Sequence, residues 1–182
     1  MGGYYSLRQK FKKSKSPLMK KIYSIINKAF QHETNSFLPF NNVIKGPINF
    51  LHGTNGIFIS GDAIIGRNCT IYHQVTIGSN MLIDSKNIGS PVIGDNCLIG
   101  AGAKIIGNIK VGDNCRVGAN AVVTSDLPDN SVIVLSKPVI YQKNNLVNKI
   151  YQQSHTCWGY LKNGEFVEEK NINKLKLLDE LK

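Results

Sequence analysis

Residues 92–123 read VIGDNCLIGAGAKIIGNIKVGDNCRVGANAVV, and this stretch repeats itself every six residues. Ile or Val returns at each sixth position from Ile93 to Val123, and the same row runs upstream from Ile59 to Ile77. A second row lies two residues earlier and is apolar but mostly small: Ile57, Ala63, Cys69, Val75, Pro91, Cys97, Ala103, Ile109, Cys115 and Ala121. A strict period of six fits neither an α-helix nor an alternating β-strand.

Short strands joined by tight turns around a triangular prism explain this period. The β-branched row fills the prism, and the small row lies where its walls crowd together. Gly94-Asp95-Asn96 and Gly112-Asp113-Asn114 are three hexapeptides apart, which is one complete coil of three faces. Gly and Asn accept the positive φ that such corners need. We therefore expect an all-β core built as a parallel β-helix, with successive coils about 4.8 Å apart.

Residues 37–138 resemble the hexapeptide-repeat acyltransferases, whose motif is an aliphatic residue, a glycine and four variable residues. The glycines after the β-branched row carry this motif: Gly66, Gly78, Gly94, Gly100, Gly112 and Gly118. The resemblance implies a left-handed coil, against the general preference for right-handed crossovers. It also implies acetyl-CoA as the acyl donor and a homotrimer with its active sites between subunits.

The rest of the chain flanks this β-helix domain. Residues 1–36 form a basic N-terminal helical segment with an amphipathic helix over residues 17–30, whose apolar stripe holds Leu18, Ile22, Ile25, Ile26 and Phe30. Residues 37–50 predict an irregular lead-in, residues 126–130 the end of the coils, and residues 132–135 a last strand. Residues 139–182 predict a mixed tail with a hairpin turn over residues 162–165 and a closing helix over residues 174–181.

The period slips once, between Ile77 and Ile93. We interpret their spacing as two hexapeptides plus four residues, with a loop over residues 79–90 extruded from one corner. Such a loop is either a tolerated insertion or, as the resemblance implies, a segment that reaches the active site at the subunit boundary.

The formal net charge is +10, and the densest basic run is N-terminal: Arg8, Lys10, Lys12, Lys13, Lys15, Lys20 and Lys21. This run is either a solvated basic helix or a contact for an anionic membrane or a polyanionic saccharide. No groove-reading motif or aromatic platform accompanies it, so we expect no nucleic-acid partner. No apolar stretch is long enough to span a membrane. Lysines also interrupt the N-terminal apolar run that a signal peptide would need. Three cysteines lie in the small apolar row, which favours the reducing cytoplasm, with the inner face of the membrane as an alternative place.

His52 is the candidate general base. Residues 50–59, FLHGTNGIFI, resemble the segment that carries this base in serine acetyltransferases and capsule-type saccharide O-acetyltransferases, with Asn55 as one extra residue. Imidazole can take a proton from a hydroxyl at neutral pH, while the hydroxyl attacks a thioester. The competing interpretation is a histidine with a purely structural role. His52 and His73 alone fall short of the three histidines that a converging metal site needs, so no metal is expected.

His73 is the second candidate, about one coil after His52 and offset by two residues. It either contacts the acceptor or thioester at a neighbour's active site, or packs at a trimer interface. Serine acetyltransferases place aspartates where this chain has Leu51 and Phe37. We therefore expect a backbone carbonyl, Asn35 or Asn49 to orient the imidazole of His52.

The resemblance assigns the coenzyme A site to small residues and two lysines. Gly78, Ser79, Ala101 and Ala119 match the positions that line the pantetheine arm, and Lys137 and Lys143 are candidates for its phosphates. Ala101 and Ala119 are three hexapeptides apart, so they stack on one corner. The competing interpretation is that small residues simply satisfy the turns.

Together these features predict an acetyl-CoA-dependent O-acetyltransferase that transfers the acetyl group directly to a saccharide hydroxyl. The changes at Leu51 and Phe37 place serine second as acceptor. N-acetylation of an amino sugar is a further enzymatic alternative, and a β-helix scaffold without catalysis is the non-enzymatic one.

Overall fold

The computed structural model describes residues 3–140, 142, 149–154, 156–162 and 164–180. Its chain forms two compact units, Met1–Lys137 and Pro138–Lys182. The first unit holds the repeats and the candidate site, and each unit is described by itself. No helix in the described residues is long and apolar enough to cross a membrane.

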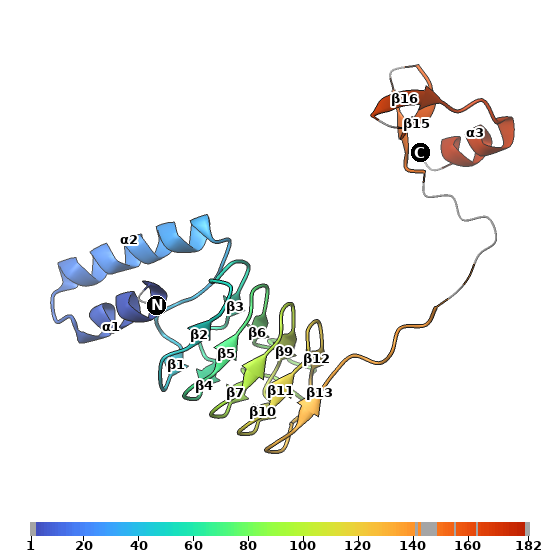
Figure 1. Ribbon diagram of the computed structural model, residues 1–182. Helices are drawn as coiled ribbons and strands as arrows, with labels where there is room; N and C mark the ends of the chain where they lie inside the picture. Colours follow the sequence, from blue (N-terminus) through green and yellow to red (C-terminus); the bar gives the residue numbers. More distant parts are fainter. Residues whose placement is uncertain (1–2, 141, 143–148, 155, 163, 181–182) are drawn as a thin grey trace. The chain divides into compact units, whose positions relative to one another are not determined.

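Three parallel sheets form the walls of a β-helix in the first unit (Figure 1). Sheet A contains β3 (Phe58–Ile59), β6 (Thr76–Gly78), β9 (Lys104–Ile106) and β12 (Val122–Val123). Sheet B contains β1 (Val43–Ile44), β4 (Ile64–Ile65), β7 (Val92–Ile93) and β10 (Lys110–Val111). Sheet C contains β2 (Asn49–Phe50), β5 (Thr70–Ile71), β8 (Leu98–Ile99), β11 (Arg116–Val117) and β13 (Val132–Ile133). The predicted β-helix is confirmed.

Both rows of the six-residue repeat point into the prism. Every Ile and Val of the first row and every residue of the second row is buried. Because each strand is only two or three residues long, one large residue per face supplies most of the core. Full burial of an Ile or Val contributes about 1.5–3 kcal/mol, so the stacked rows stabilise the coil as a unit.

The regular coils begin earlier and end later than predicted. β1 and β2 pair in register with β4 and β5, so residues 43–50 are a full part of the helix and not an irregular lead-in. Leu127 bridges to Val111, and β13 pairs with β11, so the coil continues past residue 130. The last strand ends at Ile133, two residues before the predicted end. Inward residues such as Ile44 and Ile48 continue the buried apolar rows through this stretch, although no glycine follows its β-branched positions.

The extruded loop contains more residues than the sequence indicates. Ile65 pairs with Ile93, and Ile93 pairs with Val111, yet the first pair is separated by ten more residues of sequence than the second. The surplus is therefore ten residues, not four, because the loop replaces one corner of a single coil. An antiparallel bridge between Asn80 and Gly89 closes its base.

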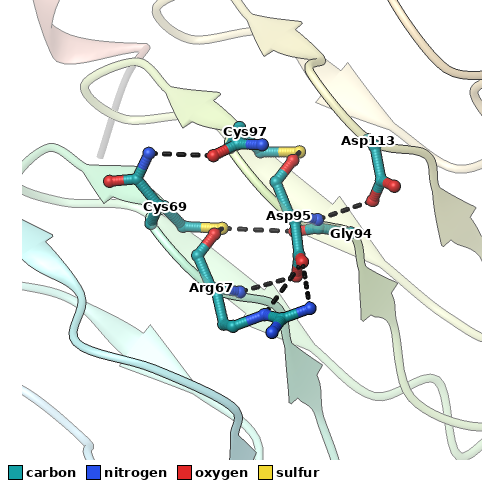
Figure 2. A network of polar contacts seen from close by, with 8 residues as sticks. Arg67, Cys69, Gly94, Asp95, Cys97 and Asp113 are labelled. Atoms are coloured by element: carbon teal, nitrogen blue, oxygen red, sulfur yellow. Dashed lines mark hydrogen bonds and ion pairs between the residues drawn. The ribbon is translucent and has the colours of Figure 1, made fainter.

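Aspartates fix the corner between sheets B and C, which we call the aspartate corner (Figure 2). Oδ1 of Asp95 accepts the backbone N–H of Arg67 at 2.7 Å, and Oδ1 of Asp113 accepts that of Asp95 at 2.7 Å. The hydrogen bond from the Arg67 backbone, with the Arg67 guanidinium, lowers the pKa of Asp95. Asn96 and Asn114 adopt φ of 58° and 57°, as the turn pattern predicts. Each aspartate thus ties one coil to the one before it.

The small row places a column of thiols beside this corner. Cys69, Cys97 and Cys115 donate to the carbonyls of Gly94, Gly112 and Pro128 at 3.3, 3.1 and 3.2 Å. The Cys69 thiol and burial raise the pKa of Cys97, and burial raises that of Cys115. The hydrogen bond with the Cys97 thiol lowers the pKa of Cys69. All three cysteines are buried, so they are small core residues.

Two helices cover the start of the coil. The predicted helix over residues 17–30 is α2, which extends to Pro17–Glu33, and no separate bounds were predicted for α1 (Gly3–Lys13) within the basic helical segment. α1 inserts Tyr4 and Arg8, with Arg8 donating to the carbonyl of Asn42 and Tyr4 donating to that of Pro39 at 2.8 Å. Burial raises the pKa of Tyr4 to about 12. The bounds and packing of α1 were not predicted because its buried face uses tyrosine and arginine instead of an aliphatic stripe.

The second unit contains an antiparallel sheet and a helix. Its strands are β14 (Tyr151–Gln153), β15 (Trp158–Lys162) and β16 (Glu165–Glu168), and α3 spans Ile172–Asp179. Lys162 pairs with Glu165, which confirms the predicted hairpin, although Asn163 lies outside the described residues. The closing helix begins two residues earlier than predicted, and Leu181 also lies outside the described residues.

Candidate active site

Four predicted site residues form one column at the corner between sheets C and A. Phe50, Ile71, Ile99 and Val117 align across sheet C. Two residues after each of them, in the same order, lie His52, His73, Ala101 and Ala119. We call this column the histidine corner. Its register stacks two imidazoles and two small residues in four successive coils.

The two histidines are aligned more closely than the sequence predicts. Phe50 pairs with Ile71, and Ile59 pairs with Ile77, but the first pair is separated by three more residues of sequence than the second. The corner after Phe50 therefore carries three additional residues, not Asn55 alone. These residues bring His52 into register with His73, so the predicted offset of two residues is wrong.

The rings of His52 and His73 contact each other directly. Their Nδ1 atoms are 3.2 Å apart, and the ring planes meet at 36°. The edge of Tyr72 packs against His52 at 5.1 Å between ring centroids. Sequence reasoning missed Tyr72, because one aromatic residue at an outward position carries no signal of its own. His52 is exposed and His73 is half-buried, so the pair forms part of the surface of the chain.

Backbone hydrogen bonds hold the corner that carries His73. The N–H of Gly102 donates to the carbonyl of His73 at 3.1 Å, and the N–H of Gln74 donates to that of Asn55 at 2.9 Å. Nζ of Lys104 donates to the carbonyl of Gln74 at 3.2 Å. The coils on both sides thus fix this corner, which makes His73 a well-positioned partner for His52.

The contact of His52 differs from the one that the sequence predicts. Asn35, Asn49 or a backbone carbonyl was expected to orient the ring, whereas within the described residues its hydrogen bond runs to His73. Phe37, which occupies the position of a family aspartate, stacks on Phe58 with ring centroids 4.9 Å apart. The side chain that contacts the ring of His52 is therefore an imidazole, while an aromatic ring occupies the position of the family aspartate.

Gly78 and Ser79 lie at another corner, between sheets A and B, where the loop leaves the coil. Oγ of Ser79 is 2.6 Å from Oγ of Ser90, and Nδ2 of Asn87 donates to the carbonyl of Thr124 at 2.8 Å. The loop therefore lies against later coils, with its apolar tip exposed: Met81, Leu82 and Ile83. We call this edge the loop corner. Within one chain the loop and histidine corners are separate edges of the prism.

Of the two lysines predicted to contact phosphates, Lys137 and Lys143, the structure describes only the first. Lys137 is exposed and follows β13, the last strand of the sheet that leads into the histidine corner. It therefore lies beyond the end of that column farthest from His52. Lys143 lies outside the described residues.

A cavity of about 500 Å³ lies beside the His52 segment, and its lining includes Tyr4, Phe30, Phe50 and Thr54. Neither imidazole of the histidine pair lines it. Within the described part of the chain, no group of three or more His, Cys, Asp or Glu residues is placed to hold a metal ion.

Comparisons with known proteins agree with this geometry. Residues 90–125 match a family model described as bacterial transferase hexapeptide (six repeats). A serine acetyltransferase of Mycobacterium tuberculosis is 42% identical over 85 residues, which are 47% of this chain and 36% of that protein.

The similar solved structures are also serine acetyltransferases. Serine acetyltransferase isoform 3 of Entamoeba histolytica, in complex with cysteine, aligns with a TM-score of 0.57 and 30% identity, over 68% of this chain and 44% of that one. Soybean serine acetyltransferase complexed with serine aligns with a TM-score of 0.54 and 34% identity, over 73% of this chain and 53% of that one. This chain thus covers about half or less of the length of each relative.

The fold and the repeat define this chain as a hexapeptide-repeat β-helix, part of which matches a bacterial transferase model. Within that class it is similar to serine acetyltransferases.

Proposed function

We propose that this protein is an acetyl-CoA-dependent O-acetyltransferase in which His52 is the general base and His73 orients it. The observation that carries the proposal is the contact between the two Nδ1 atoms at 3.2 Å, at the head of a column of small residues. The similarity to serine acetyltransferases supports acetyl-CoA as donor. The free, buried cysteines fit a reducing cytoplasm.

The contact determines the proton positions that catalysis requires. A hydrogen bond between two Nδ1 atoms needs one donor and one acceptor. If His52 is to accept a proton at Nε2, its Nδ1 must carry the hydrogen and donate it to Nδ1 of His73. His73 then carries its own hydrogen on Nε2. In this arrangement His73 fixes the tautomer of His52, the task that a carboxylate performs for other catalytic histidines.

Direct transfer follows from this arrangement. Nε2 of His52 takes the hydroxyl proton while the acceptor oxygen attacks the thioester carbonyl carbon. The resulting imidazolium keeps its hydrogen bond to His73 as positive charge develops. Collapse of the tetrahedral intermediate breaks the carbon–sulfur bond, and the proton on Nε2 passes to the leaving sulfur. The products are the O-acetyl ester and free coenzyme A.

The coenzyme site requires more than one chain. The predicted cofactor residues Gly78 and Ser79 lie on the loop corner, whereas Ala101 and Ala119 lie on the histidine corner. A groove lined by all four needs the loop corner of one protomer beside the histidine corner of the next. This requirement supports the trimer, with Lys137 at the far end of the groove as a phosphate contact.

Serine is the acceptor that the comparisons favour, although the sequence placed it second. The relatives named above are serine acetyltransferases, and one was solved with serine. A saccharide hydroxyl remains the second candidate because of Phe37 and Phe58, which present exposed stacked rings in place of a carboxylate. The names of these relatives give no support to an amino sugar.

A thiol-release assay with acetyl-CoA tests this proposal. We expect coenzyme A release with L-serine, and His52→Ala should lower kcat/KM by about 10²–10⁴-fold without a change in Tm. His32→Ala is the matched control, because His32 is exposed on α2, and it should retain full activity. Wild-type activity in His52→Ala would refute the assignment, and turnover of saccharide hydroxyls but not serine would favour the second acceptor.

The role of His73 has its own readout. His73→Ala should lower kcat more than it raises KM, and His73→Asn should recover part of the loss because its amide oxygen can accept the hydrogen bond. Nitrogen-15 NMR of the imidazoles should report hydrogen on Nδ1 of His52 in the wild type and a mixture of tautomers in His73→Ala. An unchanged tautomer in that variant would contradict the orienting role, whatever its activity.

A further inference from the structure

α2 leaves most of its apolar stripe uncovered. Tyr23 and Phe30 pack against the core, and Asn27 donates to the carbonyl of Leu38 at 3.0 Å. The opposite side shows large aliphatic side chains to solvent, with exposed fractions of 67% for Leu18, 39% for Ile22, 58% for Ile25 and 47% for Ile26. The predicted stripe therefore exists, but it does not face the β-helix as an ordinary amphipathic helix would.

Positive charge borders this apolar face. Lys21 and Lys28 are seven residues apart on α2, so they lie in one row beside Leu18 and Ile25. The segment 1–32 contains eight lysines and arginines and no aspartate or glutamate. Long lysine side chains can lie along an apolar surface while their ammonium groups reach outward. The face thus combines an aliphatic centre with a basic margin.

We propose that this face of α2 docks on the surface of an anionic lipid bilayer. Helices with such a composition lie in the plane of the interface, with apolar side chains among the acyl chains and lysines at the phosphates. Charge complementarity favours this occupant over a second copy of the chain. A symmetric pairing through the same face would bring the two lysine rows together, with Glu33 at the end of α2 as the one acidic residue of the helix.

Vesicle flotation of the full chain tests the proposal. We expect binding to vesicles of phosphatidylcholine with phosphatidylglycerol, and little binding to phosphatidylcholine alone. Each lysine at an anionic surface strengthens binding about fivefold, so Lys21→Gln with Lys28→Gln should weaken it about 25-fold. The pair Lys170→Gln and Lys176→Gln is the matched control. It removes the same charge from exposed positions of the second unit and should leave binding unchanged.

The apolar centre is tested separately. Ile22→Ser with Ile25→Ser should weaken vesicle binding at least tenfold while the far-UV circular dichroism stays unchanged. Equal losses in the lysine pair and its control would overturn the proposal, since they would indicate a net-charge effect. It would also be overturned if the serine variant altered only the oligomeric state, or if dextran sulfate bound strongly and anionic vesicles did not.

Discussion

Replacing Gly66 with alanine places a methyl group between two coils at the aspartate corner. The added Cβ would lie 2.3 Å from the carbonyl oxygen of Gly94 and 2.4 Å from its carbonyl carbon. Both atoms belong to the backbone, so no side-chain rotation can relieve the contact. The neighbouring coil must therefore move by about 1 Å to reach ordinary van der Waals separation.

The loss in the free energy of unfolding comes from overpacking and from a hydrogen bond between coils that the movement breaks. Overpacking of this kind costs about 1–3 kcal/mol. The hydrogen bond from the N–H of Gly66 to the carbonyl of Ile93, 2.9 Å long, contributes about 0.5–1.5 kcal/mol more. A loss of about 2–4 kcal/mol in the free energy of unfolding corresponds to a fall in Tm of about 6–12 °C for a unit of this size.

Thermal melts followed by far-UV circular dichroism measure this effect, because the repeats dominate the strand signal. Gly3→Ala is the matched control, since a Cβ there meets no atom within 4 Å. We expect that control to melt close to the wild type. A Gly66→Ala protein whose Tm stays near that of Gly3→Ala would show that the coils are not packed as closely as described.

Three further predictions concern the core, the thiols and the second unit. Ile99→Ala should lower the free energy of unfolding by about 2–5 kcal/mol in chemical denaturation, because the side chain is fully buried. Ellman's reagent should label Cys157 in the native protein and the three other cysteines only after unfolding, and rapid native labelling of more than one thiol would contradict the buried column. The hydrogen bond from Tyr151, with the backbone N–H of Asn171, lowers the pKa of Glu169 from 4.5 to about 2. Its folded-state pKa is the lower one, so Glu169→Gln should destabilise the second unit at neutral pH. The difference should fade as pH falls from about 4.5 to about 2, as reported by the fluorescence of Trp158, the one tryptophan in the sequence.

The six-residue period was sufficient to predict the coil, because both of its rows point into the prism and are buried. The irregular parts could not be predicted in the same way. The stretch with Ile44 and Ile48 is a regular coil, although the sequence predicted an irregular lead-in there. α1 is anchored by Tyr4 and Arg8, whose partners are backbone carbonyls that no sequence pattern announces.

The candidate site shows the same limit. The stacking of Ala101 and Ala119 followed from their spacing, because no residue is inserted between their coils. The alignment of His52 with His73 did not, since it depends on how many residues the corner after Phe50 absorbs. The number of inserted residues at a corner is decided by tertiary packing, and the sequence offers no periodic signal for it.

The register of the histidine corner also sets the distance along the prism between His52 and Ala119. Successive coils are about 4.8 Å apart, so His52 and Ala119, three coils apart, are separated by roughly 14 Å along the prism. Deleting residues 95–112 would remove one complete coil, join Gly94 to Asp113, and shorten that distance by a single step while leaving both histidines in place. The length of this edge is therefore counted in whole turns of the chain, and insertion or deletion of complete coils changes it only by such increments.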